Sequence, residues 1–344
     1  MTNNQNILTC ISIDWLQLNC SRSGGPLGTR AGIYNVKKLP HQTRHFRDVY
    51  EIYLFKELCA SIAMNPHSTV LASDMALLKV ENKFLYNYDL PNFVESLLKS
   101  LSLQLNNITR LDLAIDFNTF CHGLHPPEFI REFLYSNIIK HGKSKYKVMG
   151  AQDHNLTFEY LKFGSGTSII SYYLYNKSKE LSEKKNKPWI SDNWKLNGLD
   201  IAKDVWRLEF SIKSNLNELM NLETSEAWSL NKLIVLQEQI KLSLFNCLLQ
   251  KYWLFSFPQA DKNKSRWHKI QFFNLDIASC ILIRLSEKKE SNRSDKIFIK
   301  KLVEYADEMR GHDFNNSIFA DQLIRHAITS RSLVKWAKEK SLIN

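Results

Sequence analysis

The strongest constraint on the fold is the stretch from Thr109 to Phe117, in which charged or small residues alternate strictly with apolar ones. Successive side chains of a β-strand point to opposite faces, so a period of two predicts a strand with one buried and one polar face. The predicted core-facing residues are Leu111, Leu113, Ile115 and Phe117. The residues predicted on the opposite face are Arg110, Asp112, Ala114 and Asp116.

Two aspartates of this polar face, Asp112 and Asp116, are separated by the small Ala114. Carboxylates held about 7 Å apart along a strand can bind a hard cation from one side. The alternative is an edge strand whose charged face is solvated. This segment alone leaves both interpretations open.

A second strand of the same kind is predicted from Val205 to Lys213, with Arg207 and Glu209 on one face. If the two strands are neighbours, Glu209 joins the two aspartates in a carboxylate site for Mg²⁺ or Mn²⁺. Arg207 then neutralises the carboxylates or holds a phosphate through two hydrogen bonds. The alternative is an ion pair between Arg207 or Arg110 and one of these acids.

The segment from Lys162 to Glu180 is a glycine turn followed by a β-branched and aromatic strand with a cationic end. Its candidate nucleophiles are Tyr172, Tyr173 and Tyr175. A tyrosine hydroxyl is a weak nucleophile because its pKa is near 10, but Lys177 and Lys179 would favour the phenolate and attract a phosphate. The alternative for each tyrosine is a packing role.

Charge points to a polyanionic partner. The 344 residues include 46 Lys and Arg against 35 Asp and Glu, a net charge of +11 with a pI near 9.2, which suggests nucleic acid. Two basic stretches, 140–147 and 177–187, are candidate DNA contacts.

Several chemistries find no support in the sequence. The six cysteines include no C-x-x-C pair, no His-x-His pattern of a histidine-ligated nickase occurs, and no GxxxxGK[ST] loop is present. The amino terminus lacks a basic signal region, and no apolar run reaches the roughly 20 residues that span a bilayer. We expect reduced thiols and a cytoplasmic protein without membrane partners.

The remaining pattern predicts an α+β fold, with an antiparallel or mixed sheet and helices in residues 1–214 and a mostly helical region in residues 215–344. A strand is expected over 8–18, helices start at Pro91 and Pro126, a helix-compatible run covers 178–187, and a loop holds Trp189 and Trp194. Apolar spacing predicts helices beyond residue 214. They cover 216–222, 229–249, 277–285, 296–309 and 317–340.

Together the three segments resemble the rolling-circle replication initiation factor family, which includes plasmid and filamentous-phage Rep proteins and related relaxases. The resemblance rests on three motifs: residues 109–116, the segment from Phe163-Gly164-Ser165 to Tyr175-Asn176-Lys177 with Glu180, and Arg207-Leu208-Glu209. In addition, Asp14-Trp15-Leu16 suits the family's opening strand. The match covers roughly residues 8–214. It departs at Asn176, where an acidic residue is usual, and at Gly166-Thr167, where a basic residue is common.

The resemblance implies Tyr175 as the nucleophile, with Lys177 and Arg207 contacting phosphate. It places Asp112, Asp116 and Glu209 around Mg²⁺ or Mn²⁺.

The implied function is metal-dependent nicking and rejoining of a DNA strand at a replication origin through a phosphotyrosyl intermediate. Expected partners are origin DNA, single-stranded or extruded as a hairpin, a host helicase and polymerase, and a second copy of the chain. The alternatives are a conjugative relaxase of a mobile element and an origin-binding protein without catalysis.

Overall fold

The computed structural model describes residues 8–275, apart from gaps at 70, 87–88, 143–144, 151–157, 166–167, 184–186, 214–218, 222–225 and 229–232, and also describes 283–284. By its contacts the chain divides into two compact units, Met1–Leu285 and Ser286–Asn344. All described residues belong to the first unit.

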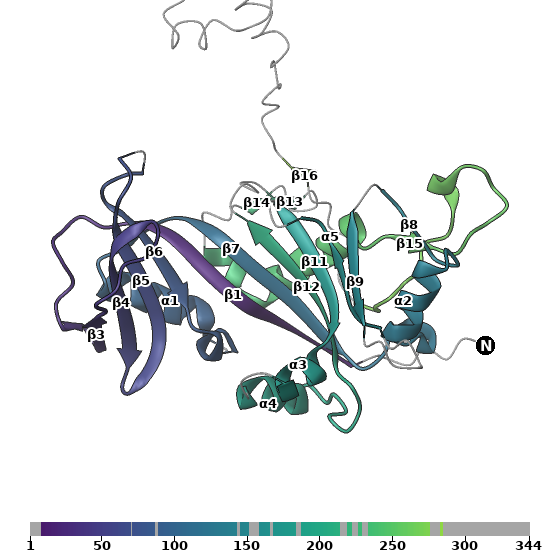
Figure 1. Cartoon of the computed structure of the whole chain (residues 1–344), viewed down its shortest axis with the longest axis horizontal. Helices are drawn as coiled ribbons and strands as arrows, with labels where there is room; N and C mark the ends of the chain where they lie inside the picture. Colours follow the sequence, from purple (N-terminus) through teal and green to yellow (C-terminus); the bar gives the residue numbers. More distant parts are fainter. Residues whose placement is uncertain are drawn as a thin grey trace, which may run out of the picture. The chain divides into compact units, whose positions relative to one another are not determined.

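An antiparallel sheet of eleven strands is the centre of this unit (Figure 1). In spatial order the strands are β2 (Arg30–Ala31), β3 (Tyr34–Lys38), β4 (Phe46–Leu54), β5 (Glu57–Pro66), β6 (Met75–Val80), β1 (Thr9–Ser21), β7 (Gln104–Phe117), β12 (Trp206–Lys213), β11 (Ile170–Asn176), β10 (Phe158–Phe163) and β9 (Tyr146–Gly150). The three segments that carry the sequence motifs are therefore the adjacent strands β7, β12 and β11.

Short helices and two small antiparallel sheets accompany the central sheet. The helices are α1 (Leu90–Ser100), α2 (Pro126–Leu134), α3 (Lys177–Glu183), α4 (Pro188–Leu196) and α5 (Glu238–Tyr252), with 3₁₀ turns η1 (Asn82–Tyr86), η2 (Cys121–Gly123), η3 (Leu233–Leu236) and η4 (Lys264–Arg266). The short strands are β8 (Ile139–Lys140), paired with β15 (Phe255–Ser256), and β13 (Leu219–Asn221), paired with β14 (Glu226–Trp228) and β16 (Ile283–Arg284). A proline at the first turn starts α1, α2 and α4, where its fixed φ suits the helix.

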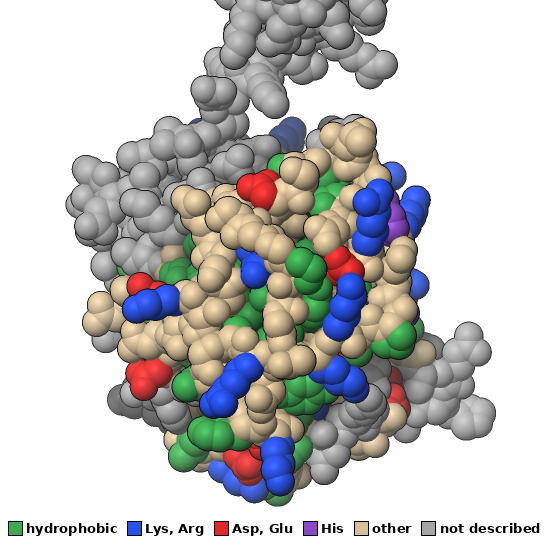
Figure 2. Space-filling view, turned by 90° about the vertical axis from the view of Figure 1, so that its left-hand side faces the viewer, with side chains coloured by type: hydrophobic (Ala, Val, Ile, Leu, Met, Phe, Trp, Pro, Cys, Tyr) green, Lys and Arg blue, Asp and Glu red, His purple; other side chains and the backbone are tan. Residues whose placement is uncertain are grey.

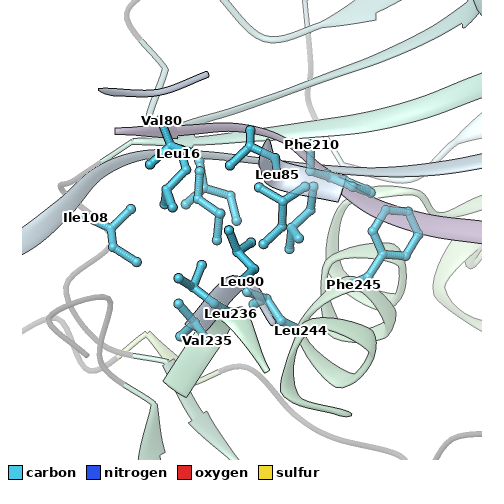
Figure 3. Close-up of a cluster of buried hydrophobic side chains, with 14 of the residues drawn as sticks. Leu16, Val80, Leu85, Leu90, Ile108, Phe210, Val235, Leu236, Leu244 and Phe245 are labelled. Atoms are coloured by element: carbon cyan, nitrogen blue, oxygen red, sulfur yellow. The ribbon is translucent and has the colours of Figure 1, made fainter. Parts of the chain in front are cut away.

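One face of the sheet is apolar and covered. Leu111, Leu113 and Ile115 of β7 are fully buried, as the alternation predicts. Figure 3 shows side chains of the strands, including Leu16 and Phe210, meeting residues of η3 and α5. Burying a side chain of this size contributes about 1.5–3 kcal/mol, so this face is a main source of stability.

The opposite face is polar and carries the predicted site. Helices α3 and α4 flank this face at the ends of β11 and β12 (Figure 1). Ile190 and Trp194 of α4 pack with Val205 in a second, smaller apolar cluster. We expected a loop at this place. A helix forms instead because Pro188 starts it and because Ile190 and Trp194, four residues apart, share its buried face.

A β-bulge interrupts the alternation of β1. Ile13 pairs with Leu113 but Trp15 pairs with Asp112, which leaves Asp14 as the extra residue. A bulge sets two successive residues against one partner residue, so Asp14 and Trp15 escape the simple period of two. Ile13 and Leu16 on either side are buried, whereas Asp14 and Trp15 are half-buried.

The region beyond residue 214 differs in part from expectation. Helix α5 confirms residues 238–249 of the helix expected over 229–249, whereas 233–236 form the turn η3. Helix α5 packs in the core of the sheet within the first unit. Strands β13 and β16 lie where helices were expected over 216–222 and 277–285, because short apolar runs do not distinguish strand from helix. The helices expected over 296–309 and 317–340 lie outside the described residues.

The sheet and helices support the α+β class for the described part of the chain. No helix within those residues is long and apolar enough to span a membrane.

Candidate functional site: a tyrosine among charged strand residues

The strand register brings the predicted residues side by side. Tyr175 on β11 lies opposite Arg207 on β12, and Arg207 lies opposite Asp116 on β7. Two pairs further along, Tyr173 faces Glu209, which faces Ala114. Equal alternation in antiparallel partners puts these residues on one face, once the adjacency of the three strands is given.

Tyr175 is held by two charged groups. Its hydroxyl donates a hydrogen bond of 2.9 Å to Oε2 of Glu209, and Nζ of Lys177 donates one of 3.3 Å to the tyrosine oxygen. Lys177 is only 2% exposed and pairs with Oε2 of Glu180 at 2.6 Å. Tyr175 therefore lies between a carboxylate that can take its proton and a fixed ammonium that can stabilise its oxygen.

The electrostatics of this cluster favour proton transfer over a free phenolate. Burial, followed by the charge of Glu209, raises the pKa of Tyr175 well above its ordinary value. The expected lowering of the tyrosine pKa does not occur, because burial and the surrounding carboxylates outweigh the opposing charge of Arg207. Burial and the charges of Asp14 and Asp112 raise the pKa of Glu209 to about 7.

Arg207 occupies a different environment. It is fully buried, with Nε and Nη2 donating to the two oxygens of Asp116 at 2.6 and 2.7 Å. Its Nη1 donates to Oδ1 of Asp14 at 2.5 Å, and Nη2 also reaches the hydroxyl of Tyr86 at 3.0 Å. The ion-pair alternative therefore describes Arg207, whose donors are engaged by these protein groups.

The acids of β7 are also engaged. Oδ2 of Asp116 accepts a further bond of 2.7 Å from Trp194. Arg110 donates to both oxygens of Asp112, at 3.0 Å from Nε and 2.5 Å from Nη2. Both aspartates thus serve arginines, one across strands and one along the same strand.

The predicted metal ligands do not form a ready cation site. Within the described residues no three His, Cys, Asp or Glu side chains are arranged to hold one metal ion. Asp116 accepts three hydrogen bonds from Arg207 and Trp194, Asp112 accepts two from Arg110, and one oxygen of Glu209 accepts the tyrosine hydroxyl. These three side chains, as placed here, do not fit a shared Mg²⁺ or Mn²⁺.

Sequence reasoning did not assign roles to Asp14, Tyr86 and Trp194. Burial tends to raise the pKa of Asp14, but the charges of Arg207, Lys177 and Lys187 outweigh it and hold that pKa below its ordinary value. The signal for Asp14 was a lone carboxylate within an apolar strand. Tyr86 and Trp194 gave no sequence signal, since their partners are distant in the chain.

The basic stretches are less free than their sequences suggest. Lys140 lies among the rings of Phe163, Tyr172 and Phe255, and burial lowers its pKa to about 8. Lys179 pairs with Glu159. On the side over β3, β4 and β5, Lys and Arg are spread over the surface with Asp and Glu between them (Figure 2). Positive charge alone therefore does not locate a DNA surface.

Comparisons with known proteins add little to the description of this site. No family model matches the sequence, and no curated protein matches it. Among solved structures, the rolling circle replication initiator protein from Geobacillus stearothermophilus is similar at 15% identity and a TM-score of 0.47, over 77% of this chain and 93% of that one. A likeness at this level does not by itself assign a function.

Proposed function

We propose that this chain nicks and rejoins a DNA strand at a replication origin, using Tyr175 as the nucleophile, and so initiates rolling-circle replication. The observation that carries the proposal is the hydroxyl of Tyr175 held 2.9 Å from the Glu209 carboxylate and 3.3 Å from the Lys177 ammonium. This arrangement pairs a nucleophile with a base within hydrogen-bond reach.

The proposed reaction follows from these groups. Glu209 accepts the hydroxyl proton as the tyrosine oxygen forms a bond to phosphorus, and Lys177 stabilises the charge that develops on that oxygen. The bond from phosphorus to the 3′ oxygen breaks, and that oxygen takes a proton from water. The products are a 5′-phosphotyrosyl adduct and a 3′-hydroxyl that a polymerase can extend.

Rejoining is the reverse of the same step. The adduct conserves the phosphodiester energy, so a 3′-hydroxyl can attack it without ATP. A requirement for Mg²⁺ or Mn²⁺ is a separate proposal, and the steps of this reaction do not depend on it. Loss of nicking when EDTA is added would support the requirement.

The test uses Tyr175→Phe on an origin oligonucleotide labelled at its 3′ end, because the phosphotyrosyl bond retains that fragment. We expect at least a thousandfold loss of nicking and no labelled protein band on a denaturing gel, since no other group supplies the bond to phosphorus. DNA binding, measured separately, should be nearly unchanged.

Two neighbouring tyrosines supply matched controls. Tyr172→Phe and Tyr173→Phe remove hydroxyls from the same strand, and both should keep the adduct. Loss of the adduct in either variant, with retention in Tyr175→Phe, would overturn the assignment. A wild-type chain that binds its origin but never cleaves a supercoiled cognate plasmid, with or without Mn²⁺, would favour the origin-binding alternative.

A further inference from the structure

A pocket of about 630 Å³ lies beside the Arg207 network. It is formed by the bulge of β1, the end of β6, the turn η1 and the start of α4, and its lining includes Asp14, Trp15, Lys187 and Trp189. Ligand pockets typically measure roughly 300–1,000 Å³, so this volume suits a single nucleotide. Asp14 belongs both to the pocket and to the network around Arg207.

The pocket contains one cation without a direct partner. The side chain of Lys187 is half-buried and makes no hydrogen bond or salt bridge with the described part of the chain, and the charge of Asp14 acts on it from nearby. The other lining lysines differ, since Lys79 pairs with Glu81 and Lys83 pairs with Glu57. Lys187 is thus the lysine that can bind an incoming anion without first breaking a salt bridge.

Two indoles line the same pocket and are held in place. Trp189 donates from Nε1 to Oδ1 of Asn82 at 2.9 Å. The ring of Trp15 has Arg110 at 4.3 Å and Lys79 at 4.5 Å from its centroid, so cations already occupy it. No cation lies over Trp189 among the described residues, which leaves its exposed ring surface open to stacking.

We propose that this pocket binds one unpaired nucleotide of the DNA strand next to the scissile phosphate, with the base against Trp189 and a phosphate on Lys187. This inference rests on the proposed nicking function. Aromatic side chains beside cations are the usual means of holding single-stranded DNA, because every base offers a ring face and every nucleotide a phosphate.

The consequence for the reaction is positional. A nucleotide held here unstacks the strand beside the catalytic cluster and sets which phosphate reaches Tyr175. Asn82, whose amide donates to the backbone oxygen and Oδ1 of Asp14 at 2.8 and 3.2 Å, connects the pocket to the Arg207 network. Asp14 therefore connects the pocket to Arg207, the residue that pairs with Tyr175 in the sheet.

The test measures binding, without cleavage, of two fluorescein-labelled probes to the full chain. One probe is a twelve-residue oligo(dT), and the other is an abasic strand of the same length and charge. We expect the full chain to bind oligo(dT) about tenfold more tightly, and Trp189→Ala to remove most of that preference, since stacking of one base is worth about this factor.

A second variant guards against misfolding, because Trp189 also packs against a small apolar cluster. Lys187→Gln changes only the end of a half-buried side chain, and it should weaken the binding of both probes about threefold to tenfold. The matched control is Lys195→Gln on the same helix α4, at an exposed lysine outside the pocket, which should change neither affinity.

The outcomes separate the two proposals. The pocket assignment is overturned, even if nicking occurs, when the wild-type chain binds both probes equally. It is also overturned when Trp189→Ala keeps the preference for oligo(dT) and Lys187→Gln binds both probes as the wild-type chain does. Displacement of oligo(dT) by free dTMP at equal affinity would assign the pocket to a mononucleotide instead of a strand. Base-dependent binding without any nicking would overturn only the nicking function.

Discussion

Arg207 and Tyr175 face each other across β12 and β11, yet their environments are opposite. Arg207 is fully buried, and its guanidinium is engaged by Asp116, Asp14 and Tyr86. Tyr175 is half-buried, and its hydroxyl is shared between Glu209 and Lys177. The two neighbours on one polar strand face thus differ in burial and in how fully their hydrogen bonds are engaged, which favours a structural role for Arg207 and leaves Tyr175 as the proposed reactive group.

The largest expected difference between the two residues is in stability. Arg207→Met leaves Asp116 and Asp14 without their cation, and breaking such a buried pair costs about 3–5 kcal/mol. Tyr175→Phe removes the two hydrogen bonds of its hydroxyl and should cost about 1–2 kcal/mol. Chemical denaturation of both variants measures the contrast, and equal losses would show that Arg207 is not the structural member of the pair.

The next expected effect is on catalysis. Glu209→Gln keeps the shape of the side chain but removes the base, and we expect nicking to slow about a hundredfold or more. Binding of the same oligonucleotide should stay within a few fold, because glutamine has the size of glutamate and the proposed role of Glu209 is that of a base. Glu180→Gln, at the other partner of Lys177, is the control and should slow nicking less. A Glu209→Gln chain that nicks at the normal rate would remove Glu209 from the reaction.

The smallest expected effect is a dependence of stability on pH. The folded pKa of Asp14 lies below its unfolded value, so this carboxylate stabilises the fold above about pH 4 and that contribution is lost as the pH falls toward the folded pKa. Asp14→Asn should lower the free energy of unfolding by about 1.5 kcal/mol at pH 7. The gap to wild type should narrow below pH 4, and a gap that widens in acid would contradict the sign of the shift.

Much of the sheet was predictable because strand alternation is a local property. The buried residues of β7 and β12 and the polar row opposite them follow from the period of two. The adjacency of the two strands was a condition of the prediction, and only the register established it. The bulge at Asp14 was not predictable in this way, because it depends on how β1 pairs with β7. Helix α4 was missed because its short, mixed segment becomes helical by packing Trp194 against the sheet.

The roles within the polar row followed the same division. Sequence spacing grouped Asp112, Asp116, Arg207 and Glu209 on one face, and their adjacency in the sheet bears this out. It did not separate a cation site from ion pairs, since both need acids beside a strand. Whether the acids bind a cation or form ion pairs depends on which groups each guanidinium contacts. For Arg207 these groups include Tyr86 and Asp14, which are distant in the sequence.

The sequence by itself determined the polar and apolar faces of the central strands and the position of Tyr175 beside Lys177, because these depend on neighbours within a few residues. Only the tertiary structure decided that Glu209 accepts the hydrogen bond of Tyr175, that Arg207 is buried between two aspartates, and that Trp189 and Lys187 line a pocket with Asp14. The physical reason is that hydrogen-bond partners and burial are set by strand register and helix packing between residues far apart in the chain.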